Sequence, residues 1–176
     1  MPSQSAVLSA IGPDRPGLVD QIAAVIHGAG GNIADSRMTI LGGEFALILL
    51  FSGSAPALAK IKKNMGPAAK RLKLAWTLQT TSAGTRSKPF IPYRLRVTGL
   101  DHPGIVHRVT SAVAKLGVNV ASLDTDLTPA PISGAPLFVL SADLQVPVDL
   151  AAAELRKALD LVCEVETLDF TLEVKA

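Results

Sequence analysis

Apolar and polar residues follow two different periods along the chain, and the order in which these periods change occurs twice. Segments that mix apolar and polar residues are typical of strands, and segments with apolar residues at helical spacing follow them. In the first half, strands are expected at residues 7–11, 33–41, 45–51 and 72–78, with helices over Val19, Ile22, Ile26 and Ala29 and over 55–65. In the second half, strands are expected at 93–97, 120–127, 137–144 and 165–174, with helices over Val106, Val109, Val113 and Leu116 and over 150–162.

Each half therefore has the predicted order βαββαβ. This order is typical of the ferredoxin-like fold, an α+β architecture in which a four-stranded antiparallel sheet carries two helices on one face. The stretch 45–51 has no charged residue, so we expect the other face of the sheet to be covered as well. A second copy of the module is the nearest candidate to cover it.

A repeated motif supports the duplication. The first half contains Gly12-Pro13-Asp14-Arg15-Pro16-Gly17-Leu18-Val19, and the second half contains Gly99-Leu100-Asp101-His102-Pro103-Gly104-Ile105-Val106, an offset of 99 − 12 = 87. The same offset relates Gly30 to Gly117 and Asn32 to Asn119. Gly30 and Gly117 fall where a helix is expected to end, and glycine tolerates the positive φ that such an end favours.

The repeat also sets the expected domain boundaries. We expect a first domain at residues 1–80, a linker at 81–91 rich in Thr, Ser and Gly, and a second domain at 92–176. Phe45 aligns best with Phe138, an offset of 138 − 45 = 93, so the second copy carries 93 − 87 = 6 extra residues between its middle strands. They belong to a proline-rich loop, 129–136, which is expected to be stiff and non-helical.

Composition favours an ordinary globular protein. The apolar share of 48% is enough for a packed core, and the net charge of +2 is too small to favour nucleic acid or an acidic membrane surface. The chain has one cysteine, so it forms no internal disulfide, and no stretch is typical of a signal peptide or a membrane span. We expect a cytoplasmic protein.

The repeated turn is the strongest candidate for a ligand site. It joins a strand to a helix, where early N–H groups have no helical partner and the helix dipole favours an anion such as a small carboxylate. Gly17 and Gly104 would let a ligand approach the backbone closely. Asn32 and Asn119 begin the next strand, where an amide can donate and accept, so a ligand could be clamped between one copy's turn and the other copy's strand.

Two structural alternatives stay open at these positions. Asp14 and Asp101 are good helix N-caps, and in that role they would partly occupy the positive site and meet the ammonium of a ligand instead of its carboxylate. Asn32 and Asn119 could instead be turn residues with positive φ.

The remaining candidates indicate neither a catalytic nor a metal site. Cys163 lies near the end of an apolar helix and is expected in the core, and His102 and His107 are too few to bind a metal. No Ser-His-Asp, Cys-His or paired-carboxylate arrangement is visible, so we expect no enzyme and no cofactor. A cluster of cations is expected to form a solvated helix face or, as the alternative, to dock an acidic partner: Lys60, Lys62, Lys63, Lys70, Arg71 and Lys73. Direct binding of nucleic acid is not expected without recognition-helix spacing or stacking aromatics.

The βαββαβ repeat, with G-x-D-x-P-G before the first helix and Gly-x-Asn after it, resembles the ACT domain, a regulatory module of amino-acid metabolism. The resemblance covers residues 7–78 and 93–174. With Pro-x-Ser-Gly-x-Pro-Leu-Phe at 131–138, the chain is similar to the glycine cleavage system transcriptional repressor family. The resemblance implies a signal such as glycine and action through a protein partner, a DNA-binding activator.

The resemblance also implies the site residues, since ACT ligands bind between paired units near the turn and the second strand. The candidates in the first copy are Gly12, Asp14, Gly17, Leu18 and Asn32, and those in the second are Gly99, Asp101, Gly104, Ile105 and Asn119. Pro131, Ser133, Gly134 and Pro136 are candidates for partner binding.

Two readings of function lead, and a third, an enzyme, is weakened by the missing catalytic constellation. In the first, the chain is a ligand-binding regulator whose ligand biases a unit-unit or protein-protein arrangement. In the second, it is an interaction module with degenerate ligand sites and the proline-rich loop as its docking element. Apolar sheet faces and edge strands make a homo-oligomer the expected state in both.

Overall fold

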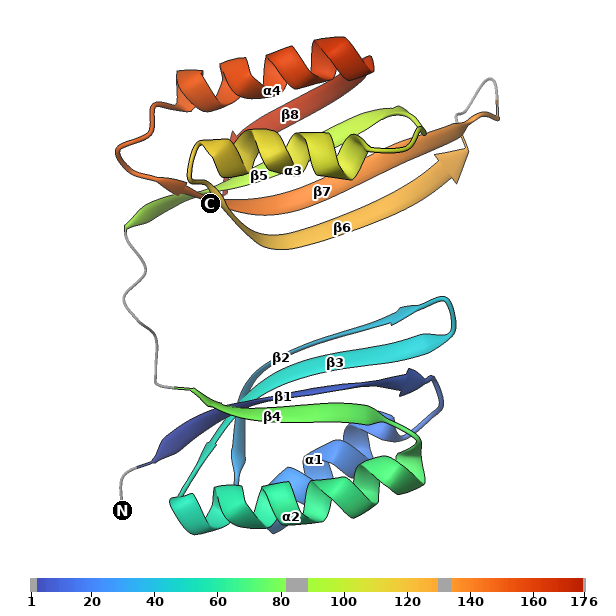
Figure 1. The fold of residues 1–176 in the computed structure, drawn as a ribbon, viewed down its shortest axis with the longest axis vertical. Helices are drawn as coiled ribbons and strands as arrows, with labels where there is room; N and C mark the ends of the chain where they lie inside the picture. The colour runs from blue at the N-terminus through green and yellow to red at the C-terminus, as the bar shows by residue number, and fades with distance from the viewer. Residues whose placement is uncertain (1–2, 82–88, 130–133, 176) are drawn as a thin grey trace. The chain divides into compact units, whose positions relative to one another are not determined.

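The computed structural model describes residues 3–81, 89–129 and 134–175, and the chain divides into two compact units, Met1–Arg86 and Ser87–Ala176 (Figure 1). The elements of the first unit are β1 (Gln4–Pro13), α1 (Leu18–Gly28), β2 (Asn32–Leu41), β3 (Glu44–Gly53), α2 (Ala55–Leu72) and β4 (Ala75–Thr81). Those of the second are β5 (Phe90–Leu100), α3 (Ile105–Lys115), β6 (Asn119–Pro129), β7 (Pro136–Pro147), α4 (Ala152–Glu166) and β8 (Leu168–Val174). The predicted order βαββαβ is confirmed in both.

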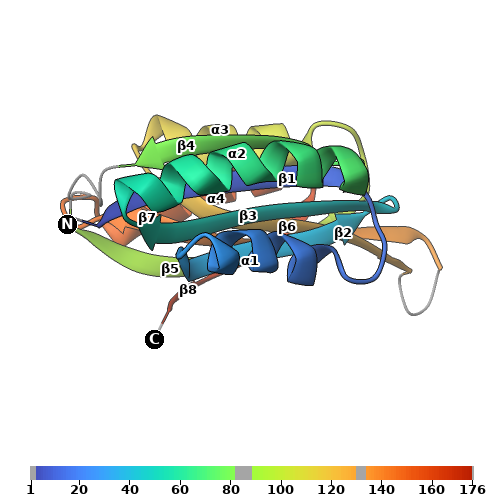
Figure 2. The same cartoon turned by 90° about the horizontal axis from the view of Figure 1, so that it is seen from below.

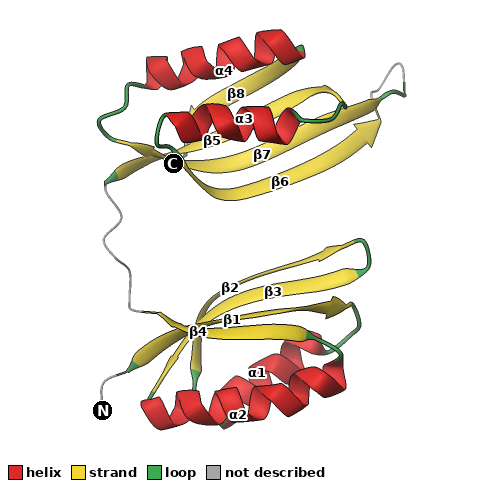
Figure 3. Ribbon diagram, in the orientation of Figure 1, coloured by secondary structure: helices red, strands yellow, loops and turns green. Residues whose placement is uncertain are grey.

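Each unit has one antiparallel four-stranded sheet with two helices on one face (Figure 3). The strand order is β2-β3-β1-β4 in the first unit and β6-β7-β5-β8 in the second, so β2 and β6 are edge strands. Seen at right angles to the first view, α1 and α2 run along the length of their strands (Figure 2). The ferredoxin-like fold class is therefore confirmed.

The helix-covered face of each sheet forms the core. On β1, the alternate residues Ala6, Leu8 and Ala10 are buried against the helices, as strand periodicity requires. Each first helix buries its initial residue, Leu18 or Ile105, and continues inward at helical spacing. The predicted helix faces were wrong at one position each, because Val19 and Val106 are 46% and 38% exposed.

The second helices run further than predicted. The α2 helix ends at Leu72, not near 65, although Pro67 lies inside it and removes one helical N–H donor. Burial of Met65 and Leu72 on the same face compensates for that loss, and Lys73 ends the helix with φ of 57°. Residues 72–74 are consequently not strand. The α4 helix likewise runs beyond 162 and reaches Glu166, so β8 begins at Leu168 instead of 165.

The hairpins between the middle strands differ in length, as predicted. Leu41 pairs with Glu44, so only Gly42 and Gly43 connect β2 to β3, and both have positive φ. The equivalent of Leu41 is Thr128, which pairs with Leu137. Eight residues lie between this pair, six more than the two between Leu41 and Glu44. Pro131 and Ser133 lie outside the described residues, whereas Gly134 and Pro136 are described and exposed.

The sheet faces that point away from the helices differ between the units, and the expectation of apolar open faces was right only for the first. There, β1 and β3 present Val7, Ile11 and Ile48. In the second unit the equivalent strands present charged side chains such as Arg94 and Asp143. Strand alternation allows this because the residues between them, not these, fill the core.

Candidate ligand-binding site

The repeated turn is held against the end of the β2–β3 or β6–β7 connection in each unit. The N–H of Asp14 donates to the carbonyl of Gly43 at 3.0 Å, and the N–H of Asp101 donates to the carbonyl of Pro136 at 3.2 Å. These bonds fix the backbone of the turn, so both aspartate side chains stay exposed.

The helix that follows the turn is capped by glycine and not by aspartate. Gly17 occupies the N-cap position of α1 with φ of 88°, and Gly104 that of α3 with φ of 102°, and neither helix has a side-chain cap. The capping alternative for Asp14 and Asp101 was wrong, because each helix begins three residues later than such a cap requires. The first N–H groups of both helices therefore have no side-chain acceptor.

The two helix N-termini differ in charge. The first turn of α1 contains Asp20, and that of α3 contains no acidic residue. Since the N-terminal end of a helix carries partial positive charge, Asp20 competes with an anionic ligand in the first unit only. The N-terminus of α3 is therefore better suited to a carboxylate than that of α1.

Each turn borders a hollow next to the edge strand. In the first unit the hollow has a volume of about 310 Å³, and Asp14, Gly17, Met38 and Phe45 are among the residues that line it. In the second unit its volume is about 470 Å³, and it is lined by Asp101, Thr125, Asp126, Leu127 and Phe138. Asp14 and Asp101 occupy equivalent positions, so the duplicated turn produces a duplicated hollow.

The first glycine of the motif has a packing role. A Cβ on Gly12 would lie 2.5 Å from the carbonyl oxygen of Lys73, and a Cβ on Gly99 would collide with the Leu168 side chain. The fold therefore requires glycine where β1 and β5 pass the end of the second helix. Leu18 and Ile105 are 2% exposed, so only their backbone N–H groups could meet a ligand.

Neither asparagine lies near the turn of its own unit. Asn32 pairs with Ser52 at one end of β3, and the turn lies beside Glu44 at the other end, 52 − 44 = 8 residues away, or about 26 Å of strand. Asn119 donates from Nδ2 to Oε1 of Gln145 at 2.8 Å. Both asparagines begin strands, and neither is among the described residues with positive φ, so the turn alternative was wrong.

The residue between Asp and Pro of the motif, Arg15 or His102, ties the turn to the second helix. Arg15 donates from Nη2 to the carbonyl of Arg71 at 3.3 Å, and Nε2 of His102 lies 3.3 Å from the carbonyl oxygen of Glu166. Both carbonyls belong to the last turn of a helix, where a cation is favourable.

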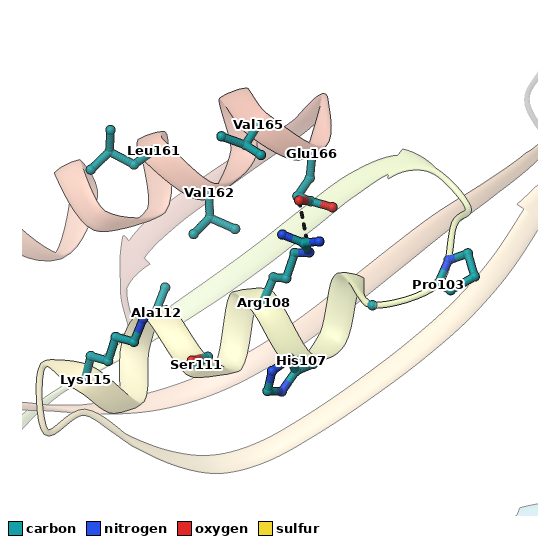
Figure 4. A pocket seen from close by; sticks show the side chains of 11 residues that line it. Pro103, His107, Arg108, Ser111, Ala112, Lys115, Leu161, Val162, Val165 and Glu166 are labelled. Carbon is teal, nitrogen blue, oxygen red and sulfur yellow. Dashed lines mark ion pairs between the residues drawn. The ribbon is translucent and has the colours of Figure 1, made fainter.

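A groove of about 570 Å³ lies between α3 and α4 (Figure 4). The Arg108 side chain points across it, and its Nε lies 3.1 Å from Oε1 of Glu166. Leu161 and Val165 line the α4 side and are 59% and 75% exposed. The groove therefore has one cationic wall and one apolar wall.

The other candidate residues occupy structural positions. Cys163 is 4% exposed in the core, and burial raises the pKa of its thiol to about 11, with the nearby carboxylates Asp160 and Asp169 adding to the effect. The cation cluster of the first unit is exposed, as expected of a solvated face. Among the described residues, no group of His, Cys, Asp and Glu is arranged to hold a metal. In the same residues no helix has the length and apolar character to cross a membrane.

Comparison with known proteins gives concordant results in sequence and structure. Residues 4–79 and residues 93–160 each match a family model described as an ACT domain. Over 159 residues the chain is 31% identical to the glycine cleavage system transcriptional repressor of Escherichia coli (strain K12), an alignment that covers 89% of this chain and 83% of that protein.

Two crystal structures match nearly the full length. An unknown protein from Galdieria sulphuraria matches with a TM-score of 0.84 and 31% identity. The match covers 99% of this chain and 100% of that protein. A proposed glycine cleavage system transcriptional repressor matches with a TM-score of 0.74 and 24% identity over 98% of both chains. At that lower identity the likeness establishes the shared fold.

Proposed function

This chain belongs to the ACT domain family, in the tandem form of the glycine cleavage system transcriptional repressors, and from that premise we propose that it is an amino-acid-responsive regulatory protein. The near-full-length similarity to a repressor supports regulation of glycine cleavage as its role. The signal in this proposal is glycine or a similarly small amino acid.

The observation that carries the proposal is the repeated turn, which leads into an uncapped helix N-terminus and borders a hollow in each unit. Free N–H groups at that terminus suit the ligand's carboxylate, and Asp14 or Asp101 on the hollow's rim suits its ammonium. In the second unit the helix has no acidic residue in its first turn, but Asp101 and Asp126 both line the hollow, so the two units are equal candidates.

Completion of the site requires a neighbouring module. Asn32 or Asn119 lies at the far end of its own sheet, so it would reach a ligand only from a second module placed side by side. The edge strand β2 is exposed along its whole length and carries Met38 and Ile40, each about half exposed. These apolar side chains support pairing through the edge, and therefore a homo-oligomer.

The regulator acts through a protein partner in this proposal, not by binding DNA or turning over a substrate. The net charge of +2 gives little electrostatic affinity for nucleic acid. The loop 129–136, which includes Gly134 and Pro136, is the proposed contact with a DNA-binding activator. A second candidate, an interaction module with degenerate ligand sites, is favoured by the same loop, because the first unit has no equivalent.

A thermal-shift screen tests the proposal. A ligand that binds the folded state raises the melting temperature, so one small amino acid at millimolar concentration should do so with the full chain. Asn32→Ala and Asn119→Ala, made separately, should show which half responds. No shift with any amino acid, together with a pull-down of partner that depends only on loop 129–136, would favour the interaction module.

A further inference from the structure

The open face of the second sheet, which points away from α3 and α4, carries two rows of polar side chains. Strand register places Arg94, Asp143 and Ser122 in one row across β5, β7 and β6. The next row consists of Arg96, Ser141 and Asp124. The rows share one face because each residue is two positions from its counterpart along its strand, and together they line a hollow of about 320 Å³.

The fold does not require all of these polar residues. In the first unit the equivalent rows are Val7, Leu50 and Asp35, and Ser9, Ile48 and Arg37. The two copies therefore differ on the central strands β3 and β7, where the first has apolar residues and the second has Asp143 and Ser141. The fold does not require polar residues at these central positions, since the first unit folds in the same way without them.

The carboxylate of the first row is engaged by two cations. The Asp143 carboxylate accepts a hydrogen bond from Nζ of Lys175 at 2.6 Å and one from Nη2 of Arg94 at 3.2 Å. The hydrogen bond from Lys175, and then that from Arg94, hold the pKa of the Asp143 carboxyl below its usual value, although burial opposes them. The Asp143 carboxylate therefore has little capacity left to bind the ammonium of a ligand.

The second row has one unengaged charge of each sign. Across the part of the chain that the structure describes, no hydrogen bond or ion pair involves the guanidinium of Arg96 or the carboxylate of Asp124. Their strands flank β7, so their Cα atoms lie about 10 Å apart with the Ser141 hydroxyl between them.

We propose that the row Arg96–Ser141–Asp124 binds a small zwitterion, a free amino acid by chemical class. Arg96 holds its carboxylate through paired N–H donors, Asp124 holds its ammonium, and Ser141 hydrogen-bonds between them. The balanced charges favour a zwitterion over an anion such as phosphate, because Asp124 repels an anion that Arg96 attracts. The hollow is near the lower limit of small-molecule sites, about 300 Å³, which favours a small ligand.

This site is separate from the hollow at the turn, and the two share no lining residue. The proposal rests on the proposed function only for the class of ligand. Asp124 belongs to the sheet's open face, whereas its neighbour Thr125 lines the hollow at the turn, so β6 borders both sites. A ligand at either site would therefore stiffen the same edge strand.

Isothermal titration of the full chain tests this site with glycine, L-alanine and L-serine. Glycine methyl ester lacks the carboxylate and N-acetylglycine lacks the ammonium, so both should fail to bind, as should inorganic phosphate. Arg96→Gln and Asp124→Asn should each weaken amino-acid binding at least tenfold, because each removes a charged hydrogen bond. Lys63→Gln and Glu164→Gln remove the same charges from exposed helix surfaces and should leave affinity unchanged.

Comparison with Asn119→Ala separates this proposal from the turn site. Loss of binding in Arg96→Gln and Asp124→Asn, but in neither Asn32→Ala nor Asn119→Ala, supports the sheet site over the turn site. Loss in Asn119→Ala alone overturns the sheet site and leaves the proposed function standing. Unchanged affinity in both sheet variants, or phosphate binding that depends on Arg96, also overturns it.

Discussion

The motif's first glycine provides a sharp test, because the structure gives it a packing role and no role in binding. A Cβ at Gly12 would lie 2.5 Å from the Lys73 carbonyl oxygen and 3.0 Å from Leu74 Cδ2, about 1 Å inside ordinary contact at the first. The obstruction is backbone, so β1 and the start of β4 must separate. Overpacking of this kind costs about 1–3 kcal/mol.

The variant Gly12→Ala also reduces the conformational entropy of the unfolded chain. This effect offsets about 0.4–1 kcal/mol of the stability lost by overpacking. We expect a net loss of about 1–2 kcal/mol, and a shift in the urea midpoint on the order of 1 M. Trp76 is the only tryptophan, lies on β4 and packs partly buried against the first core, so its fluorescence reports on the first unit alone. This matters because two units need not unfold together.

Gly28→Ala is the matched control. A Cβ at Gly28 meets nothing within 4 Å, and Gly28 lies in a helix. The free energy of unfolding of this variant should therefore be unchanged or rise by up to about 1 kcal/mol. Equal midpoints for Gly12→Ala and the wild type would refute the packing argument. Reduced amino-acid affinity in Gly12→Ala with unchanged stability would instead assign this glycine to the ligand.

Three further predictions concern the core, the open face and the edge. Cys163 should fail to react with a thiol reagent at pH 8 until urea unfolds the second unit, since its pKa of about 11 keeps the thiol protonated. Because the pKa of Asp143 is lowered on folding, its contribution is present above its ordinary pKa of 3.8 and lost as pH falls through the folded value. The stability deficit of Asp143→Asn should therefore be seen at pH 7 and diminish in an acid unfolding series as the pH falls below 3.8. Met38→Glu on the exposed edge strand should lower the oligomer mass measured by light scattering, whereas Val148→Glu, equally exposed after β7, should not.

Much of the fold could be predicted because it depends on periodicity and glycine. The apolar spacing identified all twelve elements in order, and Gly30 and Gly117 have the positive φ expected after their helices. The errors arose where packing overrides local signals. Burial of Met65 and Leu72 carries α2 past Pro67, and a left-handed Gly17 turns Leu18 inward in place of Val19.

The candidate site was less predictable, because its parts come from different strands. The turn was identified, but not the residues that complete each hollow, such as Met38 or Thr125, which depend on strand register. Capping by aspartate was a reasonable hypothesis from residue type alone. It failed because the start of the helix depends on backbone conformation three residues downstream.

The duplication separates what the fold needs from what a function needs. Gly12 and Gly99, and Gly17 and Gly104, recur because both copies must pass the same corner and begin a helix there. Such agreement between copies says little about ligands. The open faces obey no common packing constraint, and there the copies diverge, with Ile48 where the second copy has Ser141. Specialised function is therefore best sought at positions where two copies of one fold disagree, and the row Arg96–Ser141–Asp124 differs at every position from its equivalent, Ser9–Ile48–Arg37.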